Sequence, residues 1–183
     1  MAKKALVLLA EGFEDIEGIT CIDILRRGGV EVTVAGLNDV LVKASRGTVV
    51  IADKKLDEVS LEFDALVLPG GLPGATNLAA SVKVNALIKT MNQAGKIVAA
   101  ICASPSVVLA PTGILKNKSV TGFPGMLENF DKTTAYQEKD VVVDGTIITS
   151  RGPATALNFA LAILEQMEGY EVSDKVRKAT LAG

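Results

Sequence analysis

Short, largely apolar segments alternate with helical patterns along this chain, and that order limits the possible folds more than any other feature. We expect strands at residues 5–10, 30–35, 65–68 and 97–101. The first, third and fourth contain only apolar residues, as parallel strands do when both faces of their sheet are covered. The pattern predicts an α/β fold of the three-layer sandwich kind, with a mostly parallel sheet and helices on both faces.

The intervening segments have the spacing of amphipathic helices, at about 15–27, 82–94, 103–109, 153–168 and 172–181. Two antiparallel pieces interrupt the alternation. Asp144-Gly145 between β-branched runs predicts a hairpin over residues 141–149. Residues 41–44 and 48–51 are expected to form a second one.

Length and composition limit the class of protein. The 183 residues suit one domain, 1–183. The net charge of −2 gives no electrostatic indication of binding to nucleic acid or to an acidic membrane. No apolar stretch approaches the roughly 20 residues that span a bilayer. Two cysteines, Cys21 and Cys102, do not make a disulfide framework, and the apolar run 5–10 is a strand rather than a signal peptide. We therefore expect a cytoplasmic protein without nucleic-acid or membrane partners.

The chain contains no histidine. Within one chain this excludes Ser-His-Asp and Cys-His catalytic groups and every metal site that needs a histidine ligand. A general acid or base must then be Glu, Asp, Lys, Tyr or Cys. We expect no metal and no cofactor.

Cys102 falls where the buried strand 97–101 gives way to the next helical pattern. Ala100 and Ser104, two residues before and after it, are small, as the sharp turn of a nucleophile elbow requires. The N-terminus of the following helix would favour the thiolate and lower the thiol pKa. The alternative is a buried, inert cysteine, which is common in strands.

Two further features are expected at the same edge of the sheet. Leu68-Pro69-Gly70-Gly71 follows another parallel strand, so the backbone N–H of Gly71 would lie beside that of Ala103 and face an oxyanion. Glu17 lies on the apolar side of the first helix, where its carboxyl is either partly buried with a raised pKa or an ordinary acid of the first helical turn. The Pro-Gly-Gly segment taken alone is also consistent with a simple turn.

Several motifs in this order resemble the ThiJ/PfpI superfamily, and within it the branch of the parkinsonism-associated protein deglycase and its bacterial relatives. The resemblance covers essentially the whole chain and is carried by ALVLLA at 5–10, GFEDIE at 12–17, DILRR at 23–27, VTVAG at 32–36, SRG at 45–47, LPGG at 68–71, AAICA at 99–103 and TSRGP at 149–153.

The resemblance implies a flavodoxin-like sandwich that forms a homodimer. It implies that Cys102 is the elbow cysteine, that Glu17 is the acid bonded to it, and that Gly71 and Ala103 line an anion pocket. Arg46 matches a family arginine near the pocket and the dimer interface, although by itself it is also consistent with a solvated charge. Glu14 is a further candidate at the pocket or interface.

The chain departs from the family pattern at two places. Relatives with stronger glyoxalase-type activity often carry a histidine after the strand that residues 119–122 resemble, where this chain has Phe123. After the elbow, Ser104-Pro105-Ser106 replaces the more usual Gly-Pro-Thr.

Two functions are consistent with these residues. In the first, Cys102 attacks an α-oxoaldehyde such as methylglyoxal, or a glycated group, and Glu17 moves the proton, so the protein is a glyoxalase or deglycase that protects against stress. In the second, Cys102 is oxidised to sulfenic and sulfinic acid, and the protein is a redox-sensing stress chaperone. The missing histidine excludes a Cys-His protease.

Overall fold

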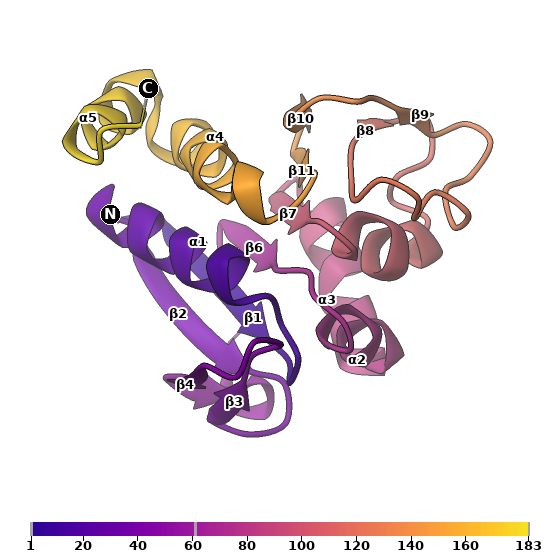
Figure 1. The fold of residues 1–183 in the computed structure, drawn as a ribbon, viewed down its shortest axis with the longest axis horizontal. Coiled ribbons are helices and arrows are strands. Elements are labelled where there is room, and N and C mark those ends of the chain that lie inside the picture. The colour runs from indigo at the N-terminus through magenta and orange to yellow at the C-terminus, as the bar shows by residue number, and fades with distance from the viewer. Residues whose placement is uncertain (1, 61, 183) are drawn as a thin grey trace.

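The computed structural model describes residues 2–60 and 62–182, in which seven strands form one central sheet (Figure 1). The order across the sheet is β10-β11-β7-β6-β1-β2-β5, and every neighbouring pair is parallel except β10 with β11. The strands are β1 (Lys4–Leu9), β2 (Glu31–Gly36), β5 (Lys54–Lys55), β6 (Ala65–Leu68), β7 (Ile97–Ile101), β10 (Val141–Asp144) and β11 (Ile147–Ser150).

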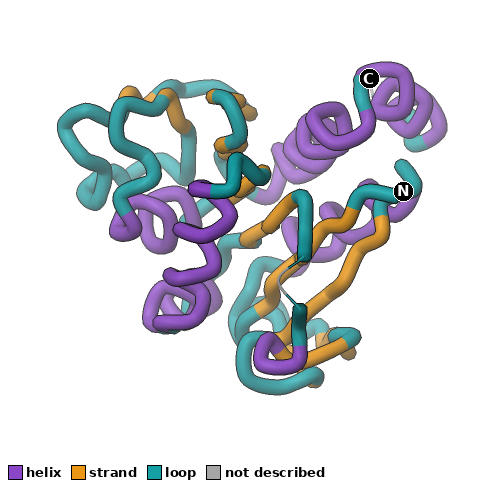
Figure 2. The backbone as a smooth tube through the Cα atoms, turned by 180° about the vertical axis from the view of Figure 1, so that it is seen from behind, coloured by secondary structure: helices purple, strands orange, loops and turns teal. Residues whose placement is uncertain are grey.

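Helices cover both faces of this sheet. In Figure 1, α1, α4 and α5 lie on one side of the strands, and α2 and α3 lie on the other. Seen from behind in Figure 2, the strands again run between the two groups of helices. The helices are α1 (Asp15–Arg27), α2 (Gly74–Ala80), α3 (Val82–Gln93), α4 (Ala156–Glu168) and α5 (Tyr170–Ala179). The predicted flavodoxin-like α/β sandwich is therefore confirmed.

The apolar composition of the central strands follows from their position. Every residue of β6 and β7 is buried, and so is β1 from Ala5 onward, because helices cover both faces. Two smaller sheets lie outside the main one. The predicted hairpin at 41–51 is present as β3 (Leu41–Lys43) and β4 (Val49–Ile51), and β8 (Ser119–Val120) pairs with β9 (Ala135–Tyr136).

Several sequence expectations differ from the structure. The segment after Cys102 is not an α-helix over 103–109 but a π-helix, Pro105–Leu109, in which the Ala110 N–H donates to the Pro105 carbonyl five residues earlier. The expected hairpin turn lies one residue later, at Gly145-Thr146, because Asp144 pairs with Ile147. The helix α2 was not expected, since its short sequence, GATNLAA, lacks an amphipathic period.

The chain's helices, over the residues that the structure describes, are all too short or too polar to cross a bilayer.

Candidate active site

Cys102 occupies a strained turn at the carboxyl end of β7. Its φ of 64° lies in the left-handed region, which costs a residue with a side chain about 1–2 kcal/mol. Backbone hydrogen bonds hold the turn: the Cys102 N–H donates to the Ser150 carbonyl at 2.9 Å, and the Cys102 carbonyl accepts from the Phe123 N–H at 2.8 Å. The sharp turn predicted from the sequence is therefore present.

The loop that follows β6 approaches this turn closely because it contains no side chain at residue 70. A Cβ atom on Gly70 would lie 2.7 Å from the Cys102 Cβ and 2.9 Å from the Glu17 Oε2, which is closer than real Cβ contacts. Gly71 has a φ of +83°, and a Cβ there would lie 2.5 Å from the Glu14 nitrogen. Both glycines are therefore required for the loop to pack against the turn and the start of α1.

Glu17 is completely buried beneath this loop. The Gly70 N–H donates to its Oε2 at 2.7 Å, and among the described residues its Oε1 has no hydrogen-bond partner. Burial raises the pKa of Glu17 to about 7, against the opposing effects of the Gly70 N–H and of the Cys102 thiol. Of the two readings that the sequence left open for Glu17, the structure supports the partly buried carboxyl with a raised pKa.

The Cys102 thiol has a raised pKa, contrary to the lowering expected from the sequence. Burial is the largest cause, the negative charge of an ionised Glu17 adds to it, and together they raise the pKa of Cys102 to about 12. The backbone N–H groups of Gly71 and Ala103 act in the opposite direction. The expected helix terminus is weak because a five-residue π-helix follows Cys102, so burial and Glu17 dominate.

Glu17 and Cys102 therefore titrate as a pair. The repulsion that raises the pKa of Cys102 exists only while Glu17 is ionised. When the carboxyl holds the proton, a thiolate at Cys102 faces a neutral acid and the N–H groups of Gly71 and Ala103. One proton placed between two groups thus gives either a carboxylate with a thiol, or a carboxylic acid with a thiolate.

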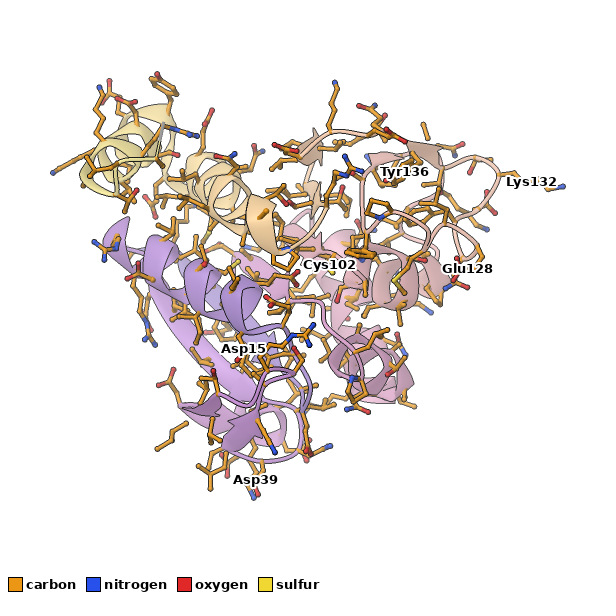
Figure 3. The ribbon with its side chains drawn as sticks, in the orientation of Figure 1. Asp15, Asp39, Cys102, Glu128, Lys132 and Tyr136 are labelled. Atoms are coloured by element: carbon orange, nitrogen blue, oxygen red, sulfur yellow. The ribbon has the colours of Figure 1, made fainter. Side chains whose placement is uncertain are left out.

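A cavity of about 340 Å³ opens above the thiol. Its lining residues come from six segments of the chain: Glu14, Ser45, Arg46, Gly71, Leu72, Cys102, Ala103, Phe123, Met126 and Pro153. Figure 3 shows Cys102 near the middle of the molecule, between Asp15 at the start of α1 and Glu128 in the loop after β8. Six of the seven site residues proposed from the sequence line this cavity, and the seventh, Glu17, lies beneath it.

The two sides of the cavity differ in chemistry. Glu14, the N-cap of α1, accepts from the Glu17 N–H at 3.0 Å, and the Arg46 N–H donates to Asp15 at 2.9 Å, so both charged residues are anchored to the start of α1. The opposite side is apolar. Phe123 is 43% exposed there and lies with Met126 against the cavity.

Sequence reasoning missed several of these residues. Ser45, Leu72 and Met126 line the cavity but were not proposed as site residues, because they lie in loops whose course depends on tertiary contacts. Gly70 was noted as part of the Pro-Gly-Gly segment, but its bond to Glu17 was not expected. The described residues contain no cluster of three or more potential metal ligands.

The raised pKa of Glu17 makes stability depend on pH. Below about pH 4.5, the ordinary pKa, the carboxyl is protonated in both the folded and the unfolded chain, so folding does not have to bury a charged carboxylate. Between about pH 4.5 and 7 the unfolded chain has lost this proton while the folded chain keeps it, so the free energy of unfolding falls by up to about 3 kcal/mol and then levels off above about pH 7. Glu17→Gln should remove this loss, so its advantage in free energy of unfolding over the wild type grows from pH 4 to pH 9.

Urea denaturation across this pH range measures the difference. Glu165→Gln, a change of an exposed carboxyl in α4, is the matched control and should stay parallel to the wild type. Parallel curves for Glu17→Gln and the wild type would contradict the burial of an ionisable Glu17.

Comparison with known proteins gives consistent results. The model of the DJ-1/PfpI family matches residues 3–166. Protein dj-1beta of Drosophila melanogaster is 45% identical over 184 residues, covering 99% of this chain and 98% of that protein. The glutathione-independent glyoxalase DJR-1.2 of Caenorhabditis elegans is 37% identical over 178 residues, covering 96% and 95%.

Solved structures agree. The crystal structure of Drosophila melanogaster DJ-1beta superposes with a TM-score of 0.95 at 44% identity and covers all of both chains. Oxidized Toxoplasma gondii DJ-1 superposes with a TM-score of 0.94 at 39% identity and covers 98% of each chain.

Proposed function

The chain belongs to the DJ-1/PfpI family, and from this premise we propose that it is a cysteine-dependent, cofactor-independent glyoxalase or deglycase that converts α-oxoaldehydes such as methylglyoxal, or their adducts. One observation carries the proposal: Glu17, with a pKa of about 7, lies buried against the thiol of Cys102 at the floor of a cavity. A general base works best when its pKa is close to the working pH. The name of the Caenorhabditis elegans relative supports the same activity.

The first step is attack of Cys102 on the aldehyde carbon. The thiol proton moves to Glu17, the sulfur forms a bond to the carbon, and the carbonyl π electrons move onto oxygen. The resulting alkoxide faces the N–H groups of Gly71 and Ala103, which lower the pKa of the Cys102 thiol and so favour negative charge at this place. Glu17 then transfers its proton to this oxygen, which completes a hemithioacetal and leaves Glu17 as a carboxylate.

In the second step Glu17 moves a proton between carbons. Its carboxylate takes the proton from the former aldehyde carbon, which gives an enediolate. The hydroxyl proton on the first carbon then passes to the oxygen of the neighbouring carbon, and Glu17 returns its proton to that carbon. The first carbon is oxidised to a thioester while the second is reduced to an alcohol, so no external oxidant or cofactor is needed. Water then hydrolyses the thioester, which releases lactate from methylglyoxal and restores the thiol.

The dimensions of the cavity suit this substrate class. A volume of about 340 Å³ holds methylglyoxal easily and leaves room for a larger adduct. Arg46 at the polar side would attract a carboxylate or a carbonyl oxygen, and Phe123 would contact the alkyl end. We place the protein in the cytoplasm, in keeping with its two free cysteines.

A redox role is the second candidate, because the Toxoplasma gondii relative was solved in an oxidized form and Cys102 is 8% exposed to solvent in the cavity. The two are separated by incubating the wild type with methylglyoxal and measuring lactate, beside the mass of Cys102-containing peptides after mild peroxide. Lactate formation supports the enzyme. Oxidation of Cys102 without any lactate would replace the enzyme by the redox-sensing stress chaperone.

We also propose a homodimer, as the family resemblance implies. Apolar side chains are exposed on α1 and β4, among them Ile16 at 54% and Ile51 at 74%. The loop between β3 and β4 joins these two elements, since the Arg46 N–H donates to Asp15. Burying these side chains against a second copy would remove apolar surface from water.

Light scattering at micromolar concentration should then give a mass twice the 19.0 kDa of one chain. Ile51→Lys should shift the mass toward that of one chain, because it places a charge in the apolar contact. A wild-type mass of one chain would refute the dimer.

A further inference from the structure

Ser104 joins the elbow to the loop after β6. It is completely buried two residues beyond Cys102, and its Oγ donates to the Pro69 carbonyl at 2.6 Å. Pro69 directly precedes the two glycines that contact Glu17 and Cys102. The hydrogen bond of this hydroxyl therefore connects the turn at Cys102 with the loop after β6.

The Pro69–Gly70 peptide group is held from both of its sides. Its carbonyl accepts from Ser104, and its N–H donates to the Glu17 Oε2 at 2.7 Å. A peptide group is planar, so fixing the carbonyl also fixes the direction of the N–H. Ser104 thus sets the position from which Gly70 holds the carboxyl of Glu17.

The orientation of the next peptide group, Gly70–Gly71, depends on that of the first. Its carbonyl accepts from the Glu14 N–H at 3.0 Å, and its own N–H is left to face Cys102. Gly70 and Gly71 have no side chains to limit rotation, so the hydrogen bonds of this loop contribute strongly to its orientation. Without the Ser104 hydroxyl, the Pro69 carbonyl loses the bond that opposes such rotation.

We propose that Ser104 is a positioning residue, whose hydroxyl fixes the Pro69–Gly70 peptide so that the Gly70 N–H holds Glu17 at the thiol and the Gly71 N–H faces the reacting oxygen. The effect on turnover rests on the proposed function. The effects on loop mobility and on the thiol do not rest on it, because the Gly70 and Gly71 N–H groups are held in place whether or not an aldehyde is the substrate.

Ser173 provides a matched control. It is also a buried serine, 2% exposed, and its Oγ donates to the Leu161 carbonyl at 2.9 Å where α5 packs against α4. Ser104→Ala and Ser173→Ala each remove one buried hydroxyl–carbonyl bond, and each should lower the free energy of unfolding. They differ only in where the bond lies.

The experiment compares wild type, S104A, S104T and S173A by three measurements. These are the pH dependence of Cys102 alkylation, amide hydrogen exchange in the peptide that contains Gly70 and Gly71, and kcat and KM for lactate formation. In S104A we expect faster exchange at these glycines and an alkylation profile moved to higher pH, because a displaced Gly71 N–H no longer lowers the pKa of Cys102. A fall in kcat of about 3- to 10-fold with KM within about twofold should accompany them.

S104T keeps the hydroxyl and should restore the wild-type alkylation profile, and S173A should leave all three measurements unchanged. If S104A does not fold, S104G removes the same hydroxyl and takes its place. An alkylation profile and glycine exchange that match the wild type in the hydroxyl-free variant would overturn the proposal. A wild type that makes no lactate would refute the proposed function alone, since exchange and alkylation still decide the role of Ser104.

Discussion

Cys102→Ser is expected to abolish lactate formation from methylglyoxal and to remove the fast-reacting thiol of the protein. A serine hydroxyl is far less acidic than a thiol, so it attacks only when an oriented base takes its proton, and the histidine that usually does so is absent from this chain. The Cys102 thiol depends less on activation by a base, because the N–H groups of Gly71 and Ala103 already stabilise the thiolate. Activity should therefore fall to the rate of the uncatalysed reaction.

Cys21→Ala is the matched control for this change. Cys21 is completely buried in α1 and lines no part of the cavity, and burial raises the pKa of its thiol even more than that of Cys102. We expect Cys21→Ala to keep wild-type lactate formation. In the wild type, limited iodoacetamide treatment at neutral pH should label Cys102 far faster than Cys21.

Mass spectrometry of the labelled peptides and a lactate assay on the same preparations measure both effects. Equal labelling of the two cysteines would contradict the functional elbow. Lactate formation that persists in Cys102→Ser would show that the thiol is not the nucleophile.

The fold could be predicted largely from the sequence because its central strands are buried on both faces. Runs such as ALVL at 65–68 have no polar residue to place in water, so they fit only the interior of a covered parallel sheet. Short elements were not predictable in this way. Helix α2 and strands β8 and β9 depend on contacts from other parts of the chain rather than on their own periodicity.

The candidate site was predictable as far as topology brings residues together. The elbow at Cys102 and the loop at Gly70 follow neighbouring parallel strands, so their carboxyl ends meet at one edge of the sheet. The thiol pKa was not predictable, because its direction depends on burial and on the charge of Glu17 rather than on the helix that was expected. The Ser104 bond to Pro69 spans 35 residues and leaves no trace in local spacing.

Glu17→Gln is expected to lower lactate formation on the order of 100-fold or more while leaving the thiol reactive. A glutamine side chain has nearly the same size, so its oxygen can accept from the Gly70 N–H as Oε2 does, and its amide can donate toward the sulfur. It cannot accept a proton from carbon. The change thus removes the base and keeps the packing.

The alkylation of Cys102 should respond in the opposite way. In the wild type at pH 8 an ionised Glu17 repels the thiolate, and this repulsion is one cause of the raised pKa of Cys102. Glutamine carries no charge, so the thiol pKa should fall and alkylation at pH 8 should be at least as fast as in the wild type. Glu17→Ala is less informative, because it loses the bond to Gly70 as well as the base.

The combination of lost turnover with retained alkylation separates a base from a group that merely activates the thiol. If Glu17 served only to ionise Cys102, turnover and alkylation would change together in Glu17→Gln. If Glu17 transfers the proton between the two carbons, turnover alone falls, and the variant should accumulate the hemithioacetal, visible as a reversible mass increase on Cys102. Unchanged lactate formation in Glu17→Gln would contradict the proposed reaction, because that reaction takes the buried carboxyl against the thiol as its base.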